Sequence, residues 1–134
     1  MGLRDGVWPE MQEESLNKTE NFVRELIGLE LAGVTFIRDY YQFAFDGPSL
    51  SLFNDITIEV KNEAMGADNI AFYAGLVNCI GNKVVDIAIK EEEYFELVFE
   101  NKNRIHTSLR LADSVSGEAL MLNMNDKDRR WIVL

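Results

Sequence analysis

The sequence predicts an α+β domain built from two similar units. Each unit is a helix followed by an antiparallel β-meander, and the two main helices pack on a mostly antiparallel sheet. Three observations support this fold: two helical patterns end at a glycine, apolar and polar residues alternate after each glycine, and turn signals recur at hairpin spacing. The 134 residues fit one domain, residues 1–134, with repeat units of about 9–61 and 68–134.

The two helices are expected at residues 9–27 and 68–80. Pro9 suits a first helical turn, where its missing N–H costs nothing, and Asp68 is a favourable N-cap residue. Gly28 and Gly81 follow the helices and supply the left-handed residue with which many helices end. Apolar residues cover most of the circumference of the second helix, so we expect it to lie deep in the structure.

The strands that follow each glycine show the repeat. At an offset of 53 residues the first strands of the two units coincide, and after a one-residue insertion the second strands coincide. Alternation with period two places one set of side chains inward. We expect the inward residues to be Ala32, Val34, Phe36, Tyr41, Phe43 and Phe45 in the first unit, and Val85, Ile87, Ile89, Phe95, Leu97 and Phe99 in the second.

Shorter strands complete each unit. They are expected at residues 50–53, 56–61, 104–111, 118–124 and 130–134. Trp131 lies in the last of these strands, and we expect it in the core, with a partner anchor as the alternative. Trp8 precedes the first helix and is expected to pack it against the body of the domain.

Charge limits the classes of partner. The chain has 23 acidic and 13 basic residues, a net charge of −10 and a pI near 4.5. Such a field repels nucleic acid and anionic membranes and attracts basic protein surfaces. The alternative is that the acidity serves solubility alone. The sequence shows neither a signal peptide nor an apolar run long enough to span a membrane, so we expect a cytoplasmic location.

The residues of catalytic and metal sites are scarce. Cys79 is the only cysteine and His106 the only histidine, which cannot supply the usual zinc ligands. Cys79 lies late in an apolar helix and is interpreted as a core residue. His106 is expected on an outward strand face near Ser108, without a carboxylate fixed beside it. No phosphate-binding glycine loop occurs. We therefore predict no catalytic residues, no metal site and no cofactor: a protein that is not an enzyme.

An acidic segment provides the candidate partner-binding residues. Three glutamates form the turn between the first two strands of the second unit, and tyrosine and two further glutamates follow on the outward face of the next strand. Aromatic residues anchor protein interfaces and acidic residues steer basic partners to them. A plain solvated strand is the alternative. The predicted partner-binding residues are Glu91, Glu92, Glu93, Tyr94, Glu96 and Glu100.

Two segments resemble a group of small, acidic, uncharacterised bacterial proteins that are similar to toxin-immunity proteins. They are LVNCIGNKVV at residues 76–85 and YFELVFEN at residues 94–101, and Glu118-Ala119 begins a later strand as in that group. The resemblance covers residues from about 27 to 134, with Asn101 in place of the usual glycine and Leu120 in place of an aromatic residue.

The resemblance implies an immunity-type inhibitor that neutralises a cognate bacterial toxin, with a nuclease as one such toxin. It implies a basic protein partner and brings no catalytic residues. The alternative from another class is a structural or regulatory module that forms a homodimer through its outward tyrosines.

Overall fold

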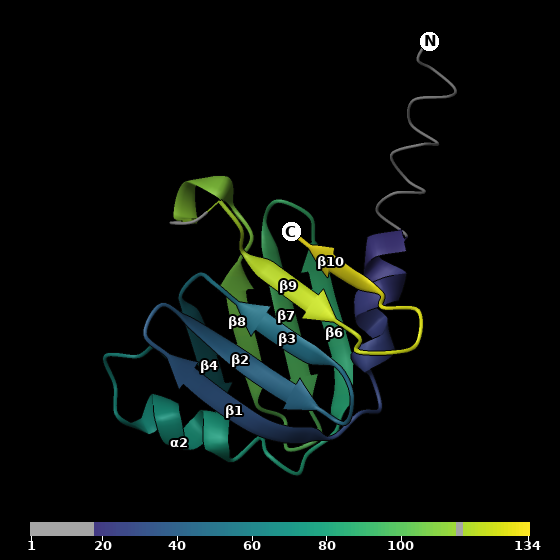
Figure 1. Ribbon diagram of the computed structural model, residues 1–134. Coiled ribbons are helices and arrows are strands. Elements are labelled where there is room, and N and C mark those ends of the chain that lie inside the picture. Colours follow the sequence, from purple (N-terminus) through teal and green to yellow (C-terminus); the bar gives the residue numbers. More distant parts are fainter. Residues whose placement is uncertain (1–17, 115–116) are drawn as a thin grey trace, which may run out of the picture.

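Two five-stranded antiparallel sheets, stacked face to face, form an α+β fold (Figure 1). The computed structural model describes residues 18–114 and 117–134. The first sheet has the order β1-β2-β3-β9-β10, with β1 Leu31–Ile37, β2 Tyr40–Phe45, β3 Ser49–Leu52, β9 Leu120–Asn123 and β10 Trp131–Val133. The second sheet has the order β5-β4-β8-β7-β6, with β5 Glu63–Met65, β4 Ile56–Val60, β8 Arg104–Ser108, β7 Tyr94–Phe99 and β6 Val84–Lys90.

The helices lie at the edges of this sandwich. Residues 18–23 are α-helical and continue into the 3₁₀ turn η1, Arg24–Leu26, beside β6. Helix α2, Ala71–Val77, contacts β4 and β1 at the other edge (Figure 1). A second 3₁₀ turn, η2, spans Leu111–Asp113. The helices thus contact the sheets at their edges and do not cover a sheet face (Figure 1), because the inner faces of the two sheets cover each other.

The units exchange their last strands. Strands β1, β2 and β3 of the first unit build one sheet, but β4 crosses over to pair with β8 of the second unit, and β5 pairs with β4. In return, β9 of the second unit pairs with β3 of the first, and β10 pairs with β9. One continuous hydrophobic core therefore fills the space between the sheets, and neither meander has a core of its own.

The first hairpins of the two units share one pairing register. Val34 pairs with Phe43 in β1–β2, and Ile87 pairs with Leu97 at the same place in β6–β7. Both hairpins have a register shift at the start of the first strand, between Leu31 and Gly33 in one and between Val84 and Asp86 in the other. The pairs in the two hairpins are thus related by offsets of 53 residues in the first strand and 54 in the second.

The shift corrects the predicted inward set. A β-bulge places two residues opposite one and so reverses the alternation beyond it. Leu31 and Val84 are therefore buried, whereas Ala32 and Val85 are exposed, contrary to expectation. Phe36 faces the expected side but remains 43% exposed, because β1 is an edge strand. The other nine inward residues are buried or half-buried, as predicted.

Backbone hydrogen bonds join the starts of β1 and β6. The Gly28 N–H donates to the Val84 carbonyl and the Gly81 N–H donates to the Leu31 carbonyl, both at 2.8 Å. Leu31 and Val84 in turn donate to Asn82 and Leu29 at 3.0 Å. Each bond has a counterpart at the same offset in the other unit, and the bridge between Glu30 and Lys83 lies between them. We call this set of bonds the β1–β6 junction.

Helix α2 is shorter and less buried than the sequence predicts. It begins at Ala71, whose N–H is bonded by the Asn69 side chain at 2.9 Å, so Asp68 is not the capping residue. Phe72, Leu76 and Cys79 are buried against the sheets. The opposite side is exposed because the helix lies at an edge, and its apolar residues are Ile70, Tyr73, Val77 and Ile80. The prediction that this helix is deeply buried is therefore wrong.

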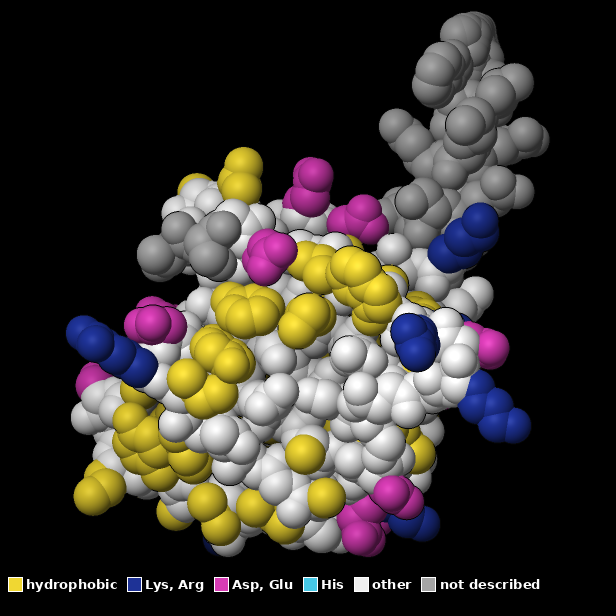
Figure 2. All heavy atoms as spheres, in the orientation of Figure 1, with side chains coloured by type: hydrophobic (Ala, Val, Ile, Leu, Met, Phe, Trp, Pro, Cys, Tyr) yellow, Lys and Arg dark blue, Asp and Glu magenta, His cyan; other side chains and the backbone are white. Residues whose placement is uncertain are grey.

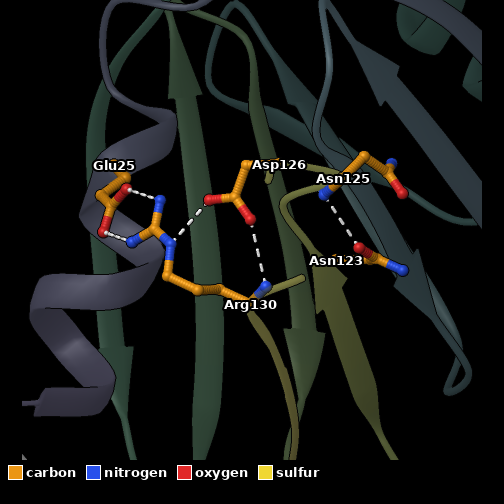
Figure 3. Close-up of polar contacts among 5 residues, drawn as sticks. All are labelled: Glu25, Asn123, Asn125, Asp126 and Arg130. Atoms are coloured by element: carbon orange, nitrogen blue, oxygen red, sulfur yellow. Dashed lines mark hydrogen bonds and ion pairs between the residues drawn. The ribbon is translucent and has the colours of Figure 1, made fainter. Parts of the chain in front are cut away.

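Arg130 connects the first helix to the β9–β10 turn (Figure 3). Its guanidinium makes two bonds with the Glu25 carboxylate, at 2.8 and 3.0 Å, and one with Asp126 at 2.7 Å. It also lies 5.6 Å from the centre of the Phe22 ring. The Arg130 backbone and side-chain donors lower the pKa of Asp126. The bidentate geometry fixes the helix against the edge of the sandwich.

Trp131 is not a core residue. It lies on the outward side of β10, the edge strand of the first sheet, and 60% of its surface is exposed. Its neighbour Ile132 points inward and packs against the core. The other tryptophan, Trp8, and the predicted helix start at Pro9 lie outside the described residues.

The junction generates a stability prediction. Gly81 has a φ of +89°, in the left-handed region where a side chain is strained, although no atom lies within 4 Å of an added Cβ. Gly81→Ala should therefore lower the free energy of unfolding by about 1 kcal/mol. Gly33→Ala is the matched control, since Gly33 also has open space but no positive φ. Urea denaturation measures both, and equal effects of the two substitutions would contradict the assignment.

Candidate functional site

Metal-binding clusters and membrane helices are absent from the described part of the chain. Residues 18–114 and 117–134 contain no group of three His, Cys, Asp or Glu side chains that could hold a metal ion. No helix among them has the length and hydropathy needed to cross a membrane. The Asp126 carboxylate, in the β9–β10 turn, forms an ion pair with Arg130 at 2.7 Å.

The acidic turn lies at the tip of the β6–β7 hairpin, at the upper end of the sandwich in Figure 1. Lys90 and Tyr94 form the last pair of the ladder, and the Glu93 N–H donates to the Lys90 carbonyl at 2.9 Å. The Glu93 carboxylate lies 3.2 Å from the Lys90 ammonium. Glu91 and Glu92 are exposed, and neither has an ion pair within the described residues.

Glu92 holds a conformation that usually belongs to glycine. Its φ is +66°, and it is the middle residue of the three-residue loop Glu91–Glu93 that joins β6 to β7. The corresponding β1–β2 turn has only two residues, Arg38 and Asp39. The one-residue insertion between the units therefore lies in the acidic turn. A glutamate in this position costs the fold conformational energy, as do the other non-glycine residues with a positive φ, such as Lys61 and Lys102.

Two further acidic residues lie near this turn. Glu91 lines a shallow hollow together with Glu20 of the first helix. On the other side of the tip, Glu92 lines a second hollow with Leu109 and Gly117, and Glu118 follows Gly117 in the chain. We define the acidic end as Glu20, Glu91, Glu92, Glu93 and Glu118. The sequence does not indicate that Glu20 and Glu118 belong to this end, because both are distant in the chain. Glu20 precedes the turn by 71 residues, and Glu118 follows it by 25.

Tyr94 and Glu96 lie on the outward face of the second sheet, below the tip. The Tyr94 ring stacks on His106 with the ring centres 5.7 Å apart. The Glu96 carboxylate is 3.1 Å from the Arg104 guanidinium and 3.4 Å from His106 Nδ1. The adjacent Arg104 therefore offsets the negative charge of Glu96, which contributes less to the long-range electrostatic field than the glutamates of the tip.

Glu100 is separated from the other predicted residues. It follows the last residue of β7, six residues after Tyr94, which corresponds to about 20 Å along an extended strand. Its carboxylate accepts a hydrogen bond from the Lys83 N–H at 3.1 Å, next to the β1–β6 junction. The structure thus brings together Glu91, Glu92, Glu93 and Tyr94, and leaves Glu100 at the opposite end of the sheet.

His106 and Ser108 do not form a pair. Both lie on the outward side of β8, as predicted, and Glu96 lies beside His106, which the sequence did not reveal. The Ser108 hydroxyl, however, donates to the Asp113 carboxylate at 2.6 Å. The serine is therefore bonded to the η2 turn, and the arrangement orders a loop at the end of the strand.

Comparison with protein-family models, with curated proteins and with solved structures found no match for this chain.

The strain at Glu92 generates a prediction of stability. Glu92→Gly should raise the free energy of unfolding by about 0.5–1 kcal/mol, because glycine adopts a positive φ without strain. Glu91→Gly removes the same charge at a position without a positive φ. This variant should lower the free energy of unfolding by about 0.5–1 kcal/mol. Thermal denaturation of both variants provides the comparison. A Glu92→Gly protein less stable than the parent would disprove the strain.

Cys79 is expected to be unreactive in the folded chain. Its side chain is buried, and burial raises the pKa of the thiol to about 11. The thiolate fraction at pH 8 is therefore small, and reagents lack access. A thiol-reactive dye should label Cys79 only in denaturant, and raising the pH to 9 should have little effect on the native protein. Rapid labelling of the native chain at pH 8 would contradict the buried position.

Proposed function

We propose that this protein is an inhibitor of the immunity type, without enzymatic activity, that binds and neutralises a basic protein partner. The candidate partner is a cognate bacterial toxin, a nuclease being one example. The observation that carries the proposal is the acidic end, where Glu91 and Glu92 are exposed at the hairpin tip and make no ion pair within the described residues.

Long-range attraction is the first step of the proposed binding. The chain carries a net charge of −10, and the glutamates of the tip concentrate part of it at one end of the sandwich. A basic surface is drawn to such an end before any contact forms, which raises the association rate. Nucleic acid and anionic membranes are repelled by the same field, so they are not proposed as partners.

Contact follows along the hairpin. Tyr94 adjoins the tip, and its ring is held by stacking on His106. An aromatic ring held in place gains contact area with little loss of conformational freedom, which suits an anchor. Glu96 and Glu100 have partners within the chain, so their proposed part in binding is secondary to that of the tip. We place this interaction in the cytoplasm, where a buried, unpaired cysteine is stable.

We also infer that the chain is a duplication of one helix-and-meander unit. The shared pairing register, the shared bulges and the reciprocal bonds of the β1–β6 junction support it. The acidic turn is a difference between the two units, because the first unit has Arg38 and Asp39 there. The proposed binding end is therefore a feature that only one unit carries.

The proposal predicts how binding responds to charge. With a basic partner, association should slow as salt rises, because exposed charges are screened over about 8 Å at physiological ionic strength. Replacing Glu91, Glu92 and Glu93 by glutamine should lower the association rate about tenfold or more at low salt and flatten its salt dependence, with a small effect on dissociation. Stopped-flow binding measures both rates.

The matched control removes three charges elsewhere. Glu30, Glu59 and Glu63 lie toward the opposite end of the sheets, so their replacement by glutamine changes the net charge equally. The control should retain most of the association rate. If both triple variants lower the association rate equally, the net charge of the chain determines that rate, and the acidic end has no special part in it.

A further inference from the structure

The outward face of the first sheet carries no charge. Its positions on β1, β2, β3, β9 and β10, all within the described residues, hold only apolar, small and uncharged polar side chains. Figure 2 shows this face, with charged side chains gathered around its rim and hydrophobic ones over its upper part. Among its members are Tyr40, Gln42, Ser49, Met121, Asn123 and Trp131. We call it the neutral face.

The second sheet provides an internal comparison. Its outward face occupies the same positions in the pairing register and carries six acidic or basic residues: Glu59, Asp86, Lys90, Glu96, Arg104 and His106. The register places Asn123, Gly33, Ile37, Gln42, Ser49 and Ser51 at the matching positions of the neutral face. A sheet face of this geometry thus accepts charges, and the neutral face has an uncharged residue at every corresponding position.

Apolar side chains remain accessible on the neutral face. Trp131 is 60% exposed, and Tyr40, Phe53, Met121 and Val133 are half-buried. The rings of Tyr40 and Phe53 lie 5.2 Å apart. Aromatic residues and methionine, with charged residues depleted, are the composition of the core of a protein interface.

We propose that the neutral face binds a second copy of this chain, forming a symmetric dimer by face-to-face packing of the two first sheets. In such a dimer each residue lies close to its own counterpart or to a near neighbour of it. Two chains of charge −10 repel each other, so contact is least costly where no charges meet.

The polar residues of this face suit a self-contact. The amides of Gln42 and Asn123 and the hydroxyl of Ser49 each have both a donor and an acceptor. Gln42 Nε2 already donates to Ser49 Oγ at 3.1 Å, and Asn123 Oδ1 accepts from the Asn125 N–H at 2.9 Å. Each group retains a further donor or acceptor for an identical group across the dimer, whereas a charged group would meet its like charge. A basic partner, in contrast, would gain nothing from the charge of the protein at this face, which separates the dimer contact from the proposed inhibitor contact.

The size of the face sets the expected affinity. Five strands spaced about 4.8 Å apart, with about five residues each at 3.4 Å, cover on the order of 400 Å². Specific interfaces bury about 800 Å² per partner, so a contact confined to the neutral face is smaller than a standard one. Small interfaces are typical of transient association, and we therefore expect a weak dimer.

Sedimentation velocity over a dilution series tests the dimer. The test variant is Gln42→Glu with Met121→Glu, which adds two charges to the neutral face; Gln42→Glu reproduces the residue at the matching position, Glu96. It should raise the dimer Kd by about 100-fold or more, because each added charge would be buried. The control, Thr57→Glu with Val98→Glu, adds two charges to the outward face of the second sheet and should change Kd less than about threefold.

Two further measurements of dimer formation require no substitution on the neutral face. In a Trp8→Phe background, the emission of Trp131 should shift to the blue as concentration rises. Higher salt should strengthen the dimer, since it screens the repulsion between two acidic chains, and this is opposite to its effect on a basic partner. If no dimer is found, the proposed inhibition is not contradicted. If no basic partner is bound, the proposed dimer is not contradicted.

The exposed stripe of α2 is the competing surface. Val77→Glu places a charge on that stripe, where Val77 is 49% exposed. It should leave the dimer intact. A wild-type chain that stays monomeric into the high micromolar range would overturn the proposal. So would dissociation by Val77→Glu without dissociation by the neutral-face variant, or association with no change in the emission of Trp131.

Discussion

The arrangement of the whole molecule depends on the β1–β6 junction. Reciprocal backbone hydrogen bonds link Gly28 with Val84 and Gly81 with Leu31, and they hold the two units together at one end of the sandwich. Both glycines have a positive φ, which lets the chain leave each helix and enter the junction directly. The first three strands of each unit lie in one sheet, and the last two strands of that unit lie in the other.

The exchange of these strands determines which surfaces reach solvent. Since the inner faces of the sheets cover each other, each sheet retains one outward face, and the helices can only occupy the open edges. The same register then gives two faces of equal geometry with different chemistry. One has paired charges, such as Glu96 with Arg104, and the other has none among its described positions. A difference between otherwise matched faces is what we expect when only one of them is adapted to a contact.

The acidic end is a second place where two otherwise matching parts of the molecule differ in charge. The two first hairpins match residue for residue until the turn, where the second unit has one more residue and three consecutive glutamates. Glu92 takes a strained φ there, and Glu20 and Glu118 come near from segments distant in the chain. Association through this end would be governed by salt-sensitive attraction, and association through the neutral face by packing. The two contacts therefore leave each other's surfaces free.

The sequence by itself determined the local structure. Alternating residues such as Phe43 and Leu97, and the glycines after the helices, gave the antiparallel strands, the two-unit register and the acidic turn, because these depend on neighbours in the chain. The tertiary structure decided the rest. The bulges that expose Ala32 and Val85, the edge position that exposes Trp131 and one side of α2, and the crossing of β4 and β9 into the opposite sheets all depend on contacts between distant segments. The burial of a residue at a sheet edge depends on which distant segments pack against that edge, and the local sequence pattern does not specify those segments.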